Sequence, residues 1–224
     1  MSNQPNVCEK SCEKNGEMTA PVGTRLIVIT GGPGAGKTAV LEMAKKVLCE
    51  RVAILPEAAS IIFGGGFWRL PSVSAKQAAQ RAIFQVQIEM ENLVMREHKW
   101  TAGLCDRGSL DGLAYWEDTE SSFWEMSRSD IRKEYAKYFA VIHLRSPTDL
   151  LGYNQQNPLR TETALQSKAI DARIAQVWVN HPNYEVIESS ENFLTKAQSA
   201  IKLISKHLPE CCGKNLADIT SIKT

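Results

Sequence analysis

A glycine-rich segment near the start of the chain has the residue types that bind phosphate. Residues 31–38 read GGPGAGKT, which fits the pattern G-x-x-x-x-G-K-T. Glycines let the backbone curl so that N–H groups point at phosphate oxygens, and a following helix adds its positive dipole end. Lys37 would reach the β- and γ-phosphates, and the Thr38 hydroxyl would reach Mg²⁺. The segment predicts a nucleoside triphosphate site formed by Gly31, Gly32, Pro33, Gly34, Ala35, Gly36, Lys37, Thr38 and Ala39.

The residues on either side of this loop match what such a motif needs. The apolar run 26–29 is typical of a buried strand, and the run 38–44 has helical character. The alternative is a chance glycine-rich turn, but strand, loop, Lys-Thr pair and helix all agree. The sequence offers no N-K-x-D element that would read guanine, so it favours ATP, with GTP as the second nucleotide.

Acidic residues stand at the ends of two further predicted strands. Glu57 follows one apolar run and Asp106 closes the next, directly before Arg107. Ligands of parallel α/β sheets bind at the carboxyl ends of the strands. Glu57 could therefore accept the proton of an attacking hydroxyl, Asp106 could hold Mg²⁺ through water or orient the acceptor, and Arg107 could neutralise phosphate charge. The alternative for Glu57 is a carboxylate that complements the dipole of a helix over 58–63.

A polar stretch after the fourth predicted strand suggests a lid, at about residues 146–162. Small phosphotransferases use a mobile lid at this place to bring arginines onto the phosphates and to exclude water. Arg160 is the catalytic candidate there, and Arg173 lies in the helix that follows. The alternative is that these arginines lie at the surface and pair with Glu162 and Asp171.

Two further residues are candidates for binding the acceptor. Asp111 would contact either the substrate or Arg107, and the alternative is a loop carboxylate solvated by water. Trp68 follows three consecutive glycines, 64–66, which form a flexible joint. Its ring would cap an acceptor or stack on a base, or else tuck against the core.

The remaining sequence predicts an α/β domain in which short apolar runs alternate with helical stretches. Five parallel strands are expected near residues 25–30, 51–55, 101–106, 138–144 and 184–188. Helices are expected at about 37–49, 74–97 and 191–207, where apolar residues recur at helical spacing. We expect crossover helices on both faces of the sheet, as in a three-layer sandwich.

Length and composition narrow the class of protein. With 224 residues, the chain fits one domain, 24–208, between a disordered leader, 1–23, and a flexible tail, 209–224. A net charge of +1 gives no basic field that would favour a nucleic acid. No segment approaches the ~20 apolar residues of a membrane span, and the first residues are not a secretory signal. Six scattered cysteines with no zinc-like spacing fit a reducing, cytoplasmic compartment.

The ordered set of segments resembles a known family. The resemblance covers about residues 24–208 and rests on five segments: 31–38, Pro56-Glu57, 106–111, 157–162 and 174–182. Together they resemble the AAA-type ATPase domain of the NadR-like group, which looks related to ribosylnicotinamide kinases and more distantly to deoxynucleoside kinases. The resemblance implies a P-loop fold with sheet order 2-3-1-4-5. Glu57 and Asp106-Arg107 match the base and the D/E-R-S motif of deoxynucleoside kinases, although Gly108 replaces the serine.

Two functions follow from these observations. The first is a kinase that moves the γ-phosphate of ATP to a hydroxyl of a nucleoside-like or other small metabolite. The second is a nucleotide-binding regulatory ATPase that acts through a protein or phosphoinositide partner, because an animal branch of the resembled family is described as binding GTP and phosphoinositide. Kinases of this shape are often dimers, so a homodimer also stays open.

Overall fold

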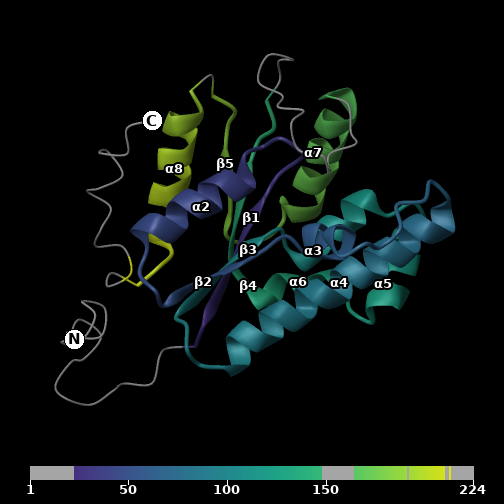
Figure 1. Cartoon of the computed structure of the whole chain (residues 1–224), viewed down its shortest axis with the longest axis horizontal. Coiled ribbons are helices and arrows are strands. Elements are labelled where there is room, and N and C mark those ends of the chain that lie inside the picture. Colours follow the sequence, from purple (N-terminus) through teal and green to yellow (C-terminus); the bar gives the residue numbers. More distant parts are fainter. Residues whose placement is uncertain (1–22, 148–163, 191, 210–211, 213–224) are drawn as a thin grey trace.

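The computed structural model describes residues 23–147, 164–190, 192–209 and 212, and its core is a single parallel sheet (Figure 1). The strands are β1 (Arg25–Thr30), β2 (Val52–Leu55), β3 (Ala102–Asp106), β4 (Tyr138–Leu144) and β5 (Tyr184–Ile187). Their order across the sheet is β2-β3-β1-β4-β5, as the resemblance implied. Every neighbouring pair is parallel, so all five carboxyl ends meet at one edge.

The central strands are buried on both faces, which explains their uninterrupted apolar sequences. In β1, the five residues from Leu26 to Thr30 are buried, and all of β3 is buried. The register pairs Ile29 of β1 with Asp106 of β3, and Thr30 with His143 of β4. This register brings the end of β3 beside the point where β1 enters the glycine-rich loop.

Helices cover both faces of the sheet (Figure 1). Helices α2 and α8 pack together over one face, and α4, α7 and η1 pack over the other. The helical elements are α2 (Lys37–Val47), α3 (Ala58–Gly64), α4 (Val73–Arg96), η1 (Ser109–Tyr115), α5 (Glu120–Ser127), α6 (Ile131–Lys137), α7 (Ala164–Trp178) and α8 (Phe193–Lys206). Two apolar clusters, one on each side of the sheet, complete the predicted three-layer sandwich.

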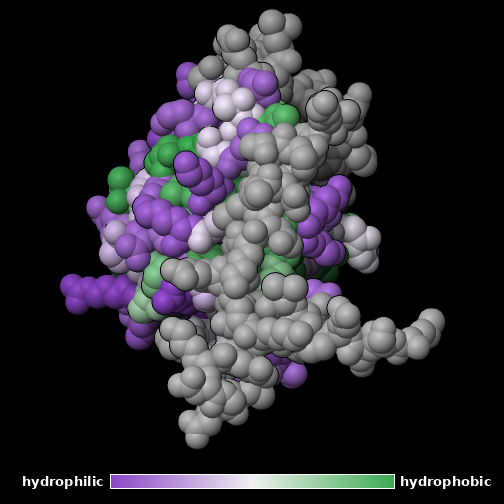
Figure 2. Space-filling view, turned by 90° about the vertical axis from the view of Figure 1, so that its left-hand side faces the viewer, coloured by the Kyte–Doolittle hydropathy of each residue, from purple (hydrophilic) through white to green (hydrophobic). Residues whose placement is uncertain are grey.

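The outer surface over α2 and α8 is mostly hydrophilic among the described residues, with small apolar patches between (Figure 2). Lys45 and Lys46 of α2 are exposed there, whereas Val40 and Leu41 of the same helix are buried. This is the division expected of a helix with one face on a core. Within the described residues, no helix is long and apolar enough to span a membrane.

The predicted elements differ from the observed ones mainly at their ends. Helix α2 stops at Val47 because Leu48 is already extended, and α4 starts one residue early because Ser72 caps it by accepting from the N–H of Ala75. Residues 1–22, most of the lid at 148–162, and 213–224 lie outside the described residues. Cys212, which was expected in a flexible tail, is buried against the α2–α8 cluster.

Candidate functional site

The glycine-rich loop joins β1 to α2 and needs backbone conformations that favour glycine. Gly31, Gly34 and Gly36 have φ angles of 137°, 81° and 89°. A side chain on Gly31 would place its Cβ 2.1 Å from the carbonyl oxygen of Leu144. Gly36 also caps the N-terminus of α2, so the loop leads directly into the positive end of that helix. This is the geometry that binds phosphate oxygens.

The ammonium group of Lys37 is buried inside the loop. Its Nζ donates to the carbonyl oxygens of Gly31, at 2.9 Å, and of Gly32, at 3.1 Å. Burial is the main cause that lowers its pKa to about 8, and Arg107 lowers it further, while Asp106 and Glu57 oppose the shift. Lys37 is therefore mostly charged near neutral pH.

Asp106, at the carboxyl end of β3, faces the first turn of α2. Its Oδ2 accepts a hydrogen bond of 2.8 Å from the Thr38 hydroxyl. Its Oδ1 is buried and has no hydrogen-bond partner among the described residues. Burial raises the pKa of this carboxyl, against the opposing charge of Lys37. An unsatisfied carboxylate oxygen beside a threonine hydroxyl fits a hard cation such as Mg²⁺, which prefers oxygen ligands.

Glu57, at the carboxyl end of β2, is held by two partners. Its Oε1 accepts from the Nε of Arg107 at 2.6 Å, and its Oε2 accepts from the Ser60 hydroxyl at 2.5 Å. Burial alone would raise the pKa of Glu57, but the charges of Arg107 and Lys37 hold it at about 2. Glu57 is the N-cap residue of α3 and makes no side-chain bond to the backbone of its first turn, but its charge lies at the positive end of that helix, so the helix-dipole role stays open beside the functional one.

The backbone of Arg107 is strained. Its φ angle is 77°, a value that non-glycine residues rarely adopt and that costs about 1–3 kcal/mol. Its N–H donates to the carbonyl oxygen of Ile29, which ties this turn to β1. The conformation aims the guanidinium across the carboxyl ends of the strands toward Glu57. Strain of this kind is concentrated at functional sites.

Asp111 lines the cavity but is only 2% exposed, so its interpretation as a solvated loop carboxylate is wrong. Both of its oxygens accept from the Thr30 hydroxyl at 2.8 Å, and its Oδ1 also accepts from the indole N–H of Trp178 at 2.6 Å. The nearest guanidinium nitrogen of Arg107 is 3.9 Å from its Oδ2. Asp111 thus connects β1, η1 and α7 beside the site.

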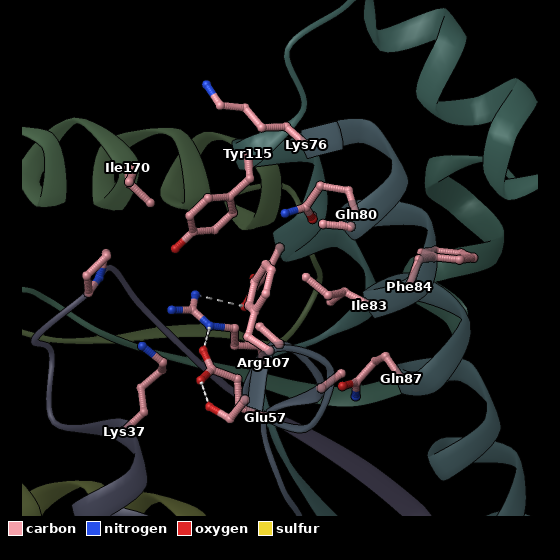
Figure 3. A pocket seen from close by; sticks show the side chains of 18 of the residues that line it. Lys37, Glu57, Lys76, Gln80, Ile83, Phe84, Gln87, Arg107, Tyr115 and Ile170 are labelled. Carbon is pink, nitrogen blue, oxygen red and sulfur yellow. Dashed lines mark hydrogen bonds and ion pairs between the residues drawn. The ribbon is translucent and has the colours of Figure 1, made fainter. Parts of the chain in front are cut away.

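A cavity of about 1170 Å³ opens from the glycine-rich loop and continues between α3, α4 and η1. At one end are Lys37, Glu57 and Arg107, and along α4 are Gln80, Ile83 and Gln87 (Figure 3). Aromatic side chains, including Phe84 and Tyr115, line the same space. The cavity therefore has a charged end at the loop and a wall along α4 that mixes apolar side chains with the amides of Gln80 and Gln87 and the ammonium group of Lys76.

The other predicted site residues have different positions. Trp68 lines the cavity but is 77% exposed, so it stands at the rim and not in the core. Arg173 is exposed and also lines the cavity. The proposed pairing partner Asp171 instead binds Arg145 and His143. Arg160 and Glu162 lie outside the described residues.

Sequence reasoning missed residues that shape the loop from outside. Asp171 of α7 accepts the N–H of Gly32 at 2.7 Å, and Lys196 of α8 donates to the carbonyl oxygen of Ala35 at 3.0 Å. Burial would raise the pKa of Asp171, but His143 and the Gly32 N–H hold it at about 2. Phe193 at the start of α8 lines the cavity next to Gly36. No local pattern marks these residues, because each acts on a segment far away in the chain.

Comparison with known proteins identifies a family that includes the glycine-rich loop. An AAA domain family model, AAA_28, matches residues 26–195. No curated protein matches the chain. Among solved structures, a deoxyadenosine kinase from M. mycoides with bound dATP has a TM-score of 0.55 at 14% identity, and the match covers 81% of this chain and 99% of that one. At this identity the match shows the fold alone. Because the family match spans most of the chain and includes the whole phosphate loop, the protein belongs to the AAA_28 family of P-loop AAA domains.

Proposed function

We propose that the protein is an ATP-dependent phosphotransferase that moves the γ-phosphate to a hydroxyl group of a small metabolite. The observation that carries this proposal is the Glu57–Arg107 ion pair, which stands where the phosphate loop meets a cavity large enough for a second molecule. A protein that only binds or hydrolyses nucleotide needs no such space beyond the γ-phosphate. The similarity in fold to a deoxyadenosine kinase supports a nucleoside-like acceptor.

Each residue of the site would have its own role in the transfer. The loop N–H groups and Lys37 would bind the phosphates of ATP, or of GTP as the second nucleotide. Thr38 and Asp106 would hold Mg²⁺, and the unpartnered Asp106 Oδ1 supports this assignment. The cation would neutralise charge on the β- and γ-phosphates. Arg107 would stabilise charge on the transferred group, and Arg160 from the lid is proposed to do the same.

Glu57 would orient the acceptor hydroxyl and receive its proton. A pKa of about 2 keeps Glu57 ionised at physiological pH, so a hydroxyl can donate to it. The same low pKa makes Glu57 a weak base. In the loose transition state of phosphoryl transfer this is sufficient, because bond formation to the attacking oxygen is slight and the proton can leave late.

The test is a search for a phosphorylated product. The protein is incubated with ATP, Mg²⁺ and a metabolite extract, and mass spectrometry follows compounds that gain one phosphoryl group. A product that depends on the protein and on Mg²⁺ supports the proposal. Turnover of ATP without a phosphorylated product across nucleosides, ribosides and sugar alcohols would reject it.

A regulatory ATPase that acts through a protein or phosphoinositide partner is the second candidate. One observation favours it: both oxygens of Glu57 already accept hydrogen bonds, from Ser60 and Arg107, so less of this carboxylate is left for an acceptor hydroxyl. This candidate predicts that the protein binds phosphoinositide vesicles or a partner protein. It also predicts that the affinity differs between the ATP-bound and the nucleotide-free protein. Equal binding of both forms would remove it.

A further inference from the structure

A buried carboxylate behind the cavity takes no part in the chemistry described above. Glu91 of α4 is 3% exposed, and its Oε1 accepts from the amide Nε2 of Gln87 at 2.8 Å and from the Tyr138 hydroxyl at 2.7 Å. Its Oε2 is buried and has no hydrogen-bond partner among the described residues. The charge of Lys137 acts on Glu91, but the Lys137 ammonium group donates to both oxygens of Glu134, at 2.7 Å each. Among the described residues, Glu91 is thus a buried carboxylate without a paired cation, an arrangement that costs free energy.

The Tyr138 hydroxyl continues this network to the turn that carries Arg107. It accepts the N–H of Ser109 at 2.8 Å and lies 2.9 Å from the Ser109 hydroxyl. The Ser109 hydroxyl in turn donates to Glu134 at 2.5 Å. Ser109 is two residues after Arg107, and the backbone of Arg107 is strained. A strained turn persists only when its surroundings fix it, and this buried network fixes its C-terminal side.

At its other end the network reaches the cavity through Gln87. This residue is buried on α4 and lines the cavity (Figure 3). One N–H of its Nε2 is engaged by Glu91, so Gln87 can offer a bound molecule its carbonyl oxygen and the second N–H of the amide. The amide of Gln87 is therefore held in one orientation by Glu91.

We propose that Glu91 is a positioning residue that fixes two parts of the site at once: the Gln87 amide on the acceptor side and, through Tyr138, the Arg107 turn at the site of transfer. The acceptor would then be a molecule that forms hydrogen bonds with the fixed Gln87 amide, including one donated from N–H or O–H to its carbonyl oxygen. This inference rests on the proposed function for its effect on transfer, and the positioning itself is measured without any acceptor.

The chain contains a matched control for this pair. Gln85 and Glu89 lie on the exposed side of the same helix, and the Gln85 amide donates to Glu89 at 2.9 Å. This pair has the same residue types and the same spacing as Gln87 and Glu91. A change that acts through helix α4 in general would affect both pairs equally, whereas a positioning role belongs to the buried pair alone.

The experiment measures hydrogen exchange of the full chain with MgATP bound, in peptides that cover residues 106–112. We expect Glu91→Leu and Tyr138→Phe each to speed exchange of the Ser109 amide by about two- to tenfold, because one buried hydrogen bond is lost or loosened. Glu91→Gln keeps an acceptor oxygen and should restore slow exchange, and Glu89→Leu should leave it unchanged. Nucleotide affinity should stay within about twofold in all variants.

Two results would overturn the proposal. One is wild-type exchange in Tyr138→Phe, which decides the question even if Glu91→Leu does not fold. The other is equally fast exchange in Glu91→Gln and Glu91→Leu. Product formation from MgATP and metabolite extract is measured in parallel, and we expect it to fall in Glu91→Leu and recover in Glu91→Gln. If no variant and no wild-type protein forms product, the proposed function fails while the exchange data still decide the positioning role.

Discussion

The Nε of Arg107 lies 2.6 Å from Oε1 of Glu57, which joins the carboxyl ends of β3 and β2 beside the phosphate loop. The two residues are 50 positions apart in the chain. Each keeps the other charged: Arg107 holds the pKa of Glu57 low, and Glu57 helps keep the pKa of Arg107 above its ordinary value despite burial. The pair presents a fixed negative group and a fixed positive group to the same point in the cavity.

Lys37→Ala should weaken binding of ATP. The substitution removes a buried ammonium group that would otherwise bind phosphate oxygens. The loss of charged hydrogen bonds is worth about 1.5–3 kcal/mol, so the dissociation constant should rise about 10- to 150-fold. Titration with a fluorescent ATP analogue measures this change. Lys45→Ala, on the exposed face of the same helix, should bind normally. Full affinity in Lys37→Ala would reject the phosphate site.

Asp106→Asn should uncouple nucleotide binding from Mg²⁺. The amide lacks the charge that the cation needs, so the gain in ATP affinity on adding Mg²⁺ should fall by about 10- to 100-fold. The comparison is the same titration with Mg²⁺ and with a chelator. Asp118→Asn, at an exposed position, should keep the full gain. A Mg²⁺ effect that survives in Asp106→Asn would remove Asp106 from the metal site.

Gly31→Ala should destabilise the fold. Its φ of 137° alone costs an alanine about 1–3 kcal/mol, and the added Cβ would lie 2.1 Å from the Leu144 carbonyl oxygen. Thermal or urea unfolding should show a loss of at least that size. Gly64→Ala meets no atom within 4 Å and should be neutral or gain up to about 1 kcal/mol. Equal stability of the two variants would show that the loop tolerates a side chain at Gly31.

Glu91 should make the protein less stable as the pH rises. Burial is the main cause that raises its pKa from 4.5 to about 7, and Glu134 adds to the shift while Gln87, Tyr138 and Lys137 oppose it. The folded state therefore binds a proton that the unfolded chain releases. The stabilisation is complete below pH 4.5 and is lost as the pH passes 7.

Glu91→Gln removes this titration and should gain stability relative to wild type between pH 5 and pH 8, by about 3 kcal/mol. Chemical unfolding at several pH values gives the difference directly. Glu89→Gln, at an exposed position on the same helix, should show a difference that does not vary with pH. A pH-independent difference for Glu91→Gln would mean that Glu91 is ionised at pH 5.

The phosphate loop and the strand-end residues could be predicted from sequence because their signals are local. The loop motif includes its own strand and helix, and parallel strands bring Glu57 and Asp106 to one edge whatever their neighbours are. The order of the strands in the sheet was predicted only from the resemblance to the NadR-like group, because the spacing of strands along the chain does not say which of them pair. Asp171 could not be found, since it reaches the Gly32 N–H across 139 residues and no pattern links the two.

The buried network around Glu91 could not be predicted from the sequence either. The helical spacing of α4 predicted a core face of apolar residues, but two of the four buried residues of this helix are Gln87 and Glu91, and the apolar Leu93 is exposed. Their partner Tyr138 opens β4, 47 positions after Glu91. Only the packing of α4 against the sheet shows that these groups satisfy each other. Elements α5, α6 and η1 were not predicted either, because they are short and depend on packing.

The most direct test of the account follows the γ-phosphate itself. ATP carrying heavy oxygen in its γ-phosphate is incubated with the protein, Mg²⁺ and a metabolite extract, and mass spectrometry locates the label. We predict labelled phosphoryl in an organic product, formed about 10²- to 10⁴-fold more slowly by Glu57→Gln although that variant still binds ATP. Label found in inorganic phosphate alone, or a Glu57→Gln variant that transfers at the wild-type rate, would contradict the account.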